Sequence, residues 1–142
     1  MIYVDTSALL KRYIAEALSN SFEAFFLSNA PLAISRLTYA EVRSALARRR
    51  RAGQIDARIE QSALQQCVTD LHEGALHLYP IEDAHFASAF DLIGRLCELP
   101  LRTLDAVHLS VAADLEATAF ATADRIQADA ALALGFEVHR FY

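Results

Sequence analysis

Residues 118–139, TAFATADRIQADAALALGFEVH, contain a complete strand–helix–strand pattern. The apolar run Thr118–Thr122 predicts a strand, and Asp124–Leu134 predicts a helix that Gly135 ends in the position where helices commonly stop. Phe136–His139 then predicts a second strand. Consecutive strands joined through a helix lie parallel in one sheet, because the helix carries the chain back to the edge where the first strand began. This stretch therefore predicts a parallel α/β fold.

The same alternation of short apolar runs and longer helical periods extends through the rest of the chain. Further strands are predicted at Ile2–Val4, Leu32–Ile34 and Leu76–Tyr79, and helices at Ser19–Ser28, Thr38–Arg51, Asp56–Leu71, Glu82–Leu96 and Thr103–Leu115. Parallel sheets are usually covered by helices on both faces. We therefore expect a three-layer α/β/α sandwich around a central five-stranded parallel sheet. At 142 residues, the chain is expected to form a single domain, residues 1–142.

Composition narrows the class of protein. Apolar residues make up 54% of the chain, which is too many for a disordered protein. No apolar run approaches the ~20 residues of a transmembrane helix, and the N-terminus lacks the pattern of a signal peptide. Cys67 and Cys97 show no metal-binding spacing and are expected to be buried, reduced thiols. We expect a cytoplasmic protein without membrane association.

Charge is unevenly distributed along the chain. The net charge of −5 argues mildly against a nucleic-acid partner, because proteins that bind nucleic acids are often basic. However, seven of the 13 basic residues fall between Arg36 and Arg58, including the run Arg48–Arg51. This run is either the solvated end of a helix or a contact with RNA or an acidic partner segment. Four consecutive helical residues point in different directions, so Arg36 and Arg43 are the better candidates for phosphate contact.

Four carboxylates share one kind of position. Asp5 and Asp124 directly follow predicted strands, and Glu41 and Asp105 are expected in the first turns of helices. Each has a structural interpretation: Asp5 and Asp124 as helix caps, Glu41 with Thr38 as a capping box, and Asp105 as an acid favoured by the positive end of a helix. In a parallel sheet, however, strand ends and helix starts share one edge, and ligand sites form along it.

Four carboxylates that converge on one site repel each other and need a cation. A ligand set of carboxylate oxygens without His or Cys favours Mg²⁺ or Mn²⁺ over Zn²⁺. A cation held in this way activates a water molecule for attack on a phosphodiester. The acids therefore predict metal-dependent hydrolysis of a phosphodiester bond.

The sequence resembles PIN-domain nucleases, specifically the VapC-type toxins of bacterial toxin–antitoxin pairs. Four blocks carry the resemblance in the family's order: MIYVDTSALLKRY (1–13), ISRLTYAEVRSAL (34–46), LRTLDAVHLSVA (101–112) and FATADRIQADAALALGFEV (120–138). The blocks are distributed over nearly the whole chain, from residue 1 to residue 138. The resemblance implies a metal-dependent endoribonuclease toxin with a five-stranded parallel sheet. It also implies a homodimer, single-stranded or looped RNA as substrate, Mg²⁺ or Mn²⁺ as cofactor, and a small antitoxin that covers the active-site groove.

The resemblance also implies which residues form the site. The family's acidic quartet falls on Asp5, Glu41, Asp105 and Asp124, with Asp5 and Asp105 as principal metal ligands, and its supporting hydroxyl positions fall on Ser7 and Thr122. Asp129 is an alternative for the fourth acid. We prefer Asp124 because it directly follows the strand, and we expect Asp129 to be a solvated helix residue.

Alternative functions and roles remain open. The chain could be a PIN nuclease of RNA processing, an inactive PIN-fold binding module, or a phosphoacceptor signalling domain, which would need a lysine near its acids. The only lysine is Lys11. His108 falls on the apolar stripe of its helix, so we interpret it as a core histidine rather than a catalytic one. Tyr13 and Tyr39 are expected to pack in the core or at the rim rather than stack on bases.

Overall fold

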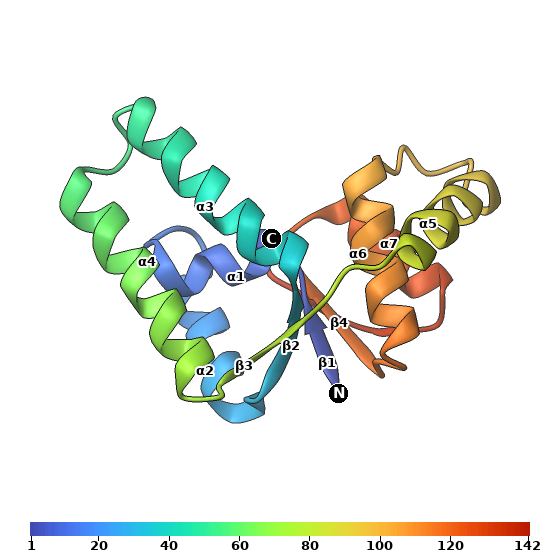
Figure 1. Ribbon diagram of the computed structural model, residues 1–142, viewed down its shortest axis with the longest axis horizontal. Coiled ribbons are helices and arrows are strands. Elements are labelled where there is room, and N and C mark those ends of the chain that lie inside the picture. The colour runs from blue at the N-terminus through green and yellow to red at the C-terminus, as the bar shows by residue number, and fades with distance from the viewer.

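The computed structural model describes residues 1–142 and contains one sheet of five parallel strands (Figure 1). The strands lie in the order β3-β2-β1-β4-β5. Their bounds are Ile2–Val4 (β1), Leu32–Ser35 (β2), Leu76–Tyr79 (β3), Ala119–Thr122 (β4) and Glu137–Arg140 (β5). The predicted five-stranded parallel sheet is therefore confirmed, with strand ends displaced by no more than one residue.

Seven helices connect the strands. They span Thr6–Tyr13 (α1), Ser19–Asn29 (α2), Arg36–Arg51 (α3), Ala57–His72 (α4), Asp83–Arg95 (α5), Thr103–Asp114 (α6) and Arg125–Ala133 (α7). The sequence pattern missed α1, which begins directly after β1 because the Asp5 side chain accepts a hydrogen bond from the Ala8 amide. None of the helices is both long enough and apolar enough to cross a membrane.

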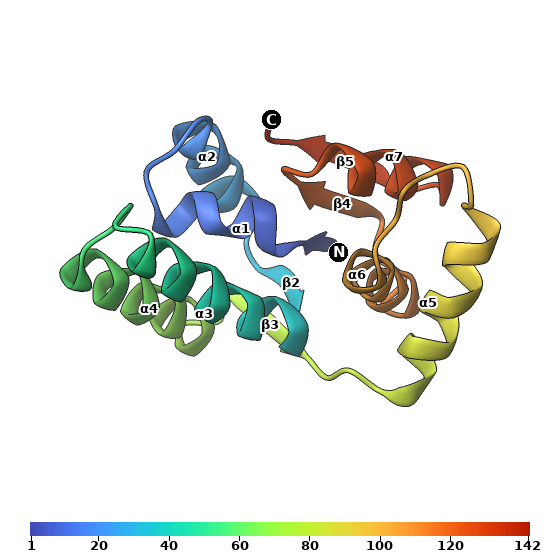
Figure 2. The same ribbon diagram turned by 90° about the horizontal axis from the view of Figure 1, so that it is seen from above.

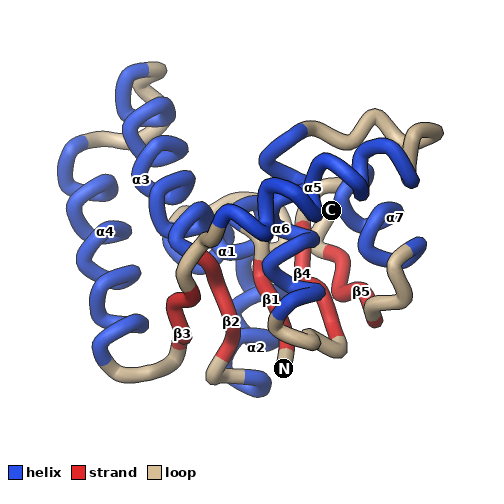
Figure 3. The backbone as a smooth tube through the Cα atoms, turned by 45° about the vertical axis from the view of Figure 1, so that its right-hand side comes forward, coloured by secondary structure: helices blue, strands red, loops and turns tan.

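The helices form two layers, one on each face of the sheet (Figure 2). Alternate strand residues point to opposite faces: Val4 and Ile34 join the core beneath α1–α4, whereas Tyr3, Ala33 and Phe120 join the core beneath α5–α7. Both cores are buried, which explains why the central strands β2, β1 and β4 are short apolar runs. Figure 3 shows the strands running side by side between these layers. The expected three-layer sandwich is confirmed.

The start of α3 differs from the prediction. The helix begins at Arg36, and Ser35 and Thr38 form its capping box by exchanging hydrogen bonds between side chains and backbone amides. The predicted capping box of Thr38 with Glu41 is therefore wrong. Because the helix starts two residues earlier than expected, Glu41 lies in its second turn rather than its first.

A buried ion pair joins α1 to α4. The Arg12 guanidinium donates to both carboxylate oxygens of Asp70, at 2.7 Å and 2.8 Å. Asp70 is 2% exposed and also accepts hydrogen bonds from Tyr13 and Gln66. Tyr13 therefore packs between helices, as expected. Of the two free cysteines, Cys67 is buried beside this pair as predicted, but Cys97 is exposed because it lies beyond the end of α5.

The strand order fixes where a site can form. From β1 the chain adds β2 and β3 on one side and then returns to add β4 and β5 on the other. The winding therefore reverses between β1 and β4, which pair from Ile2↔Ala119 to Val4↔Ala121. Ligands of open parallel sheets bind at the carboxyl ends of such strands. The next residues along the chain are Asp5 and the segment that leads to Asp124.

Candidate active site

A cavity of about 360 Å³ opens at the carboxyl edge of β1 and β4. It is surrounded by the N-terminal parts of α1, α6 and α7 and by one side of α3 from Glu41 to Arg48. The four predicted acids all line it: Asp5, Glu41, Asp105 and Asp124. Asp129 is exposed on α7 and does not line the cavity. The structure thus brings together four acids from segments as far apart in the sequence as residues 5 and 124.

Asp5 is the most deeply buried of the four acids, with 2% of its surface exposed. The Ser7 hydroxyl donates to it at 2.8 Å, the Thr122 hydroxyl at 2.7 Å and the Ala8 amide at 2.9 Å. Burial raises the pKa of Asp5, and the nearby His108 and these hydrogen bonds only partly offset that effect. Ser7 and Thr122 therefore occupy the positions expected of supporting hydroxyls, and they fasten β1 to the end of β4.

Glu41 is held by partners from two other helices. It accepts a hydrogen bond from the Thr6 hydroxyl at the start of α1, and His108 Nε2 on α6 lies 2.7 Å from its Oε2. Burial alone would raise the pKa of Glu41, but the hydrogen bond and charge of His108, with Thr6, outweigh it and hold the pKa below its usual range. Glu41 therefore carries a negative charge toward the cavity at neutral pH.

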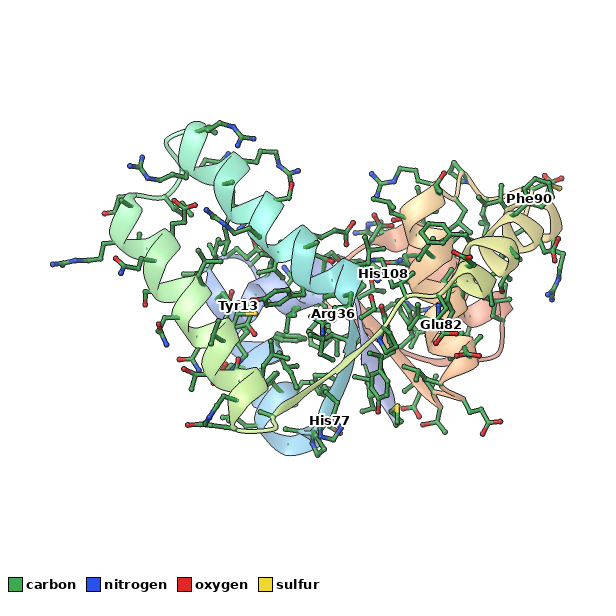
Figure 4. All side chains as sticks on the ribbon, in the orientation of Figure 1. Tyr13, Arg36, His77, Glu82, Phe90 and His108 are labelled. Carbon is green, nitrogen blue, oxygen red and sulfur yellow. The ribbon has the colours of Figure 1, made fainter.

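His108 connects the site to the core. It is 3% exposed and lies between α6 and α3 (Figure 4), with Nδ1 2.8 Å from the Tyr3 hydroxyl. Tyr3 in turn donates to Ser35 at 2.9 Å, at the start of α3. His108 is a core histidine with both ring nitrogens bonded, as the apolar stripe predicts. The apolar pattern of α6 could not reveal that His108 also contacts Glu41, because Glu41 lies 67 positions away in the sequence.

Asp105 and Asp124 both form ion pairs with the guanidinium group of Arg102. The Arg102 guanidinium contacts Asp105 through Nε at 2.9 Å and through Nη2 at 3.3 Å, and the same Nη2 lies 3.5 Å from Asp124 Oδ2. Asp105 lies in the first turn of α6, and Asp124 caps α7 through the Gln127 amide at 3.0 Å. The sequence pattern did not single out Arg102, although its position three residues before Asp105 is a spacing at which helical side chains meet.

The basic stretch contributes less to the cavity than its length suggests. Of the run Arg48–Arg51, only Arg48 lines the cavity, whereas Arg49 pairs with Glu16 at 2.8 Å. Arg43 pairs with Glu60 at 2.6 Å on the outer side of α3 and α4, and Arg36 does not line the cavity. Arg36 and Arg43, the expected candidates for phosphate contact, therefore lie outside the cavity, and the two arginines that line it are Arg48 and Arg102.

The residues at the cavity fit a hydrated divalent cation. All four acids are carboxylates, which are the ligands that Mg²⁺ and Mn²⁺ prefer. No three His, Cys, Asp or Glu side chains lie close enough to enclose a cation on their own; each carboxylate is bonded to another group of the protein. Mg²⁺ typically retains several waters and needs only one or two carboxylates directly. The open, carboxylate-lined cavity matches that requirement.

Comparison with known proteins identifies the family. The family model for the PIN domain matches residues 2–132. The chain belongs to the PIN-domain family. PIN-domain nucleases are hydrolases that cleave RNA. A cavity lined by carboxylates is compatible with that reaction. The resemblance seen in the four sequence blocks is thereby confirmed. No curated protein sequence matches the chain.

Solved structures share the fold at low sequence identity. VapC20 of Mycobacterium tuberculosis, a sarcin–ricin loop cleaving toxin, is 18% identical with a TM-score of 0.74, over 97% of this chain and 98% of its own. FitAcB of Neisseria gonorrhoeae is 18% identical with a TM-score of 0.69, over 98% and 96%. VapBC2 of Rickettsia felis, bound to a promoter DNA fragment, is 17% identical with a TM-score of 0.64, over the full length of both chains. At this identity the likeness establishes the fold.

Proposed function

We propose that this PIN domain is a metal-dependent endoribonuclease and the toxin of a toxin–antitoxin pair. The observation that carries the proposal is the convergence of Asp5, Glu41, Asp105 and Asp124 on one open cavity at the point where the sheet's winding reverses. The family membership supplies the class of reaction, hydrolysis of RNA. Two arginines on the cavity wall, Arg48 and Arg102, offer contacts for RNA phosphates in an otherwise acidic protein.

Asp5 and Asp105 are the proposed principal ligands of Mg²⁺ or Mn²⁺, with Glu41 and Asp124 completing the cluster. When bound, the cation would supply an activated water and neutralise charge on the phosphate. The protein's own contribution is to hold the carboxylates in place. Ser7 and Thr122 fix Asp5 at hydrogen-bond distance, so this acid keeps its orientation whether or not a cation is present.

Glu41 has a different role in this mechanism. Its lowered pKa keeps it ionised, and its bond to His108 fixes the direction in which the carboxylate points. An ionised carboxylate beside an attacking water can orient that water or accept its proton. Because a water attacks rather than the RNA 2′-hydroxyl, no cyclic phosphate forms. With the 3′-oxygen as leaving group, the expected products carry a 5′-phosphate and a 3′-hydroxyl.

The toxin assignment rests on the fold relatives and the four sequence blocks. One relative is itself an RNA-cleaving toxin, and another is a complex bound to DNA of its own promoter. We therefore propose a small antitoxin partner that covers the acidic cavity, a homodimer of this chain as a single domain, and structured or looped RNA as substrate. The free thiols Cys67 and Cys97 favour a reducing compartment, the cytoplasm.

A phosphoacceptor domain would need a lysine beside its acids, and no lysine lines this cavity. Lys11 is 8% exposed, and its ammonium group bonds to Glu16 and to the Ala17 carbonyl, away from the cavity. The remaining rivals are a PIN nuclease of RNA processing and a PIN domain that binds RNA without cutting it. Both keep the same fold, so a cleavage assay separates the non-cleaving domain from the toxin, and the effect of expression on growth separates the processing nuclease.

The test is cleavage of structured RNA by purified, antitoxin-free protein. We expect cleavage with Mg²⁺ or Mn²⁺, none with EDTA, and products with 5′-phosphates. Asp5→Asn and Asp105→Asn should each lower the rate by at least about a hundredfold, whereas Asp129→Asn, the same change outside the cavity, should leave it unaltered. Cleavage that survives EDTA would exclude the metal mechanism. Active protein that does not slow growth when expressed alone would favour the processing nuclease.

A further inference from the structure

Arg102 contacts the two carboxylates that a cation would need on the α6–α7 side of the cavity. Its guanidinium bridges Asp105 and Asp124, at 2.9 Å and 3.5 Å to their Oδ2 atoms. We propose that Arg102 is a built-in counterion that competes with the divalent cation for Asp105 and Asp124 and, once displaced, binds an RNA phosphate. This inference rests on the proposed function of the same site.

The competition follows from shared acceptor atoms. Asp105 Oδ2 receives Arg102 Nε, and Asp105 Oδ1 receives Arg102 Nη2, so both oxygens of this carboxylate are engaged by one guanidinium. A cation that coordinates Asp105 directly must displace at least one of these bonds. Without Arg102, Asp105 and Asp124 would be two like charges at the rim of an acidic cavity. The arginine therefore stabilises the metal-free site and opposes metal binding.

The Arg102 side chain can leave at little cost. It is 74% exposed, so water can replace the carboxylates as its hydrogen-bond acceptor. The backbone of Arg102 stays fixed at the N-cap of α6, where its amide donates to Asp105 at 3.3 Å. A displaced guanidinium therefore remains tethered at the rim of the cavity. From there it can reach an incoming phosphate, a group whose geometry a guanidinium matches with two parallel hydrogen bonds.

Arg48 provides a matched control for this competition. It carries the same side chain, lines the same cavity from α3, and makes no hydrogen bond or ion pair with any of the four acids. Loss of Arg48 removes one positive charge from the cavity, as loss of Arg102 does. Only loss of Arg102 also frees the carboxylate oxygens. A difference between the two variants therefore isolates the direct contact from the general effect of charge.

The first experiment is calorimetric titration of the RNA-free protein with Mn²⁺ alone. Arg102→Ala should bind Mn²⁺ about fivefold more tightly than the wild type, because an exposed ion pair of good geometry contributes up to ~1 kcal/mol. Arg102→Lys should fall between the two, and Arg48→Ala should change the affinity by less than about twofold. Equal affinities of the wild type and Arg102→Ala would overturn the competition. Absence of Mn²⁺ binding in both would overturn the proposed function itself.

The second experiment measures RNA cleavage at saturating Mn²⁺. Arg102→Ala should raise KM while kcat changes little, and its affinity for RNA should fall less steeply with salt, by about one unit of the log–log slope. Arg102→Lys should recover part of the KM, because the charge is kept. An unchanged KM in Arg102→Ala would remove the phosphate contact from the proposal even if the metal affinity rises.

Discussion

Replacement of Asp105 by Asn separates metal binding from fold stability. In the metal-free protein the substitution loses the charged contact with Arg102, whose side chain is 74% exposed, so the cost is no more than ~1 kcal/mol. It also removes one of the like charges in the cavity, which offsets part of that cost. The Asn side chain still accepts the Arg102 amide hydrogen bond at the start of α6. We therefore expect the metal-free melting temperature to change by only a few degrees.

Metal should stabilise the two proteins unequally. A cation at 100 times its dissociation constant adds about 2.7 kcal/mol to the wild type by mass action, provided that the unfolded chain does not bind it. For a chain of 142 residues, roughly 3–4 °C per kcal/mol gives a rise in melting temperature of roughly 10 °C. If Asp105→Asn weakens binding at least tenfold, its gain at the same concentration falls to about 1.4 kcal/mol or less, roughly 5 °C.

The assay is thermal unfolding, followed by circular dichroism, of the wild type, Asp105→Asn and Asp129→Asn, each in EDTA and in Mn²⁺. Asp129→Asn removes the same charge from an exposed position and should behave as the wild type does. The reasoning is refuted if Asp105→Asn gains as much from Mn²⁺ as the wild type. It is also refuted if metal shifts neither protein, because the acids would then serve only as helix caps and as hydrogen-bond partners within the protein.

Three further outcomes follow from the contacts around the site and beneath α1. Arg12→Ala should lower the free energy of unfolding by roughly 3 kcal/mol in urea denaturation, since it strands the buried Asp70 carboxylate; Arg43→Ala, which breaks an exposed pair, should cost under about 1 kcal/mol. Burial alone would raise the pKa of Asp70, but Arg12 outweighs it and lowers the pKa, so this stabilisation is present above the unfolded-state value of about 3.9 and is lost as pH falls further. Urea titrations from about pH 5 down to about pH 2 should show that loss in the wild type and a flatter curve in Arg12→Ala. His108→Gln should lower kcat and move the acidic limb of the pH–rate profile upward, because Glu41 loses the partner that lowers its pKa; an unmoved limb would contradict the positioning role.

The sheet was predictable because its three central strands are largely buried on both faces. Ile2–Val4, Leu32–Ser35 and Ala119–Thr122 each read as a short apolar run between helical periods, and that pattern requires only local information. Helix α1 was missed because the eight residues Thr6–Tyr13 follow the strand without a break. Asp5 was recognised as a possible helix cap. However, the apolar residues on both sides of it give no local signal for where the strand ends and the helix begins.

The acids of the site were predictable, but their partners were not. A strand end or a helix start can be located from local pattern, and parallel topology then places all four acids on one edge. The contacts of Glu41 with Thr6 and His108 depend on how α1, α3 and α6 pack against each other. Likewise, Arg102 reaches Asp124 only because α6 and α7 begin side by side. Such contacts join residues far apart in the chain and leave no periodic signal in the sequence.

Helix capping is compatible with the proposed metal binding by the same acids. Asp5 accepts the Ala8 amide and Asp124 accepts the Gln127 amide, so both act as N-caps. A Ser or Asn would cap these helices equally well, but only a carboxylate also presents a negative charge at the carboxyl edge of the sheet. The backbone amides at the positive ends of α1 and α7 offset part of the cost of that charge when no cation is bound. Helix starts therefore hold together carboxylates that would otherwise repel each other. The proposed cation site is thus assembled before a cation binds.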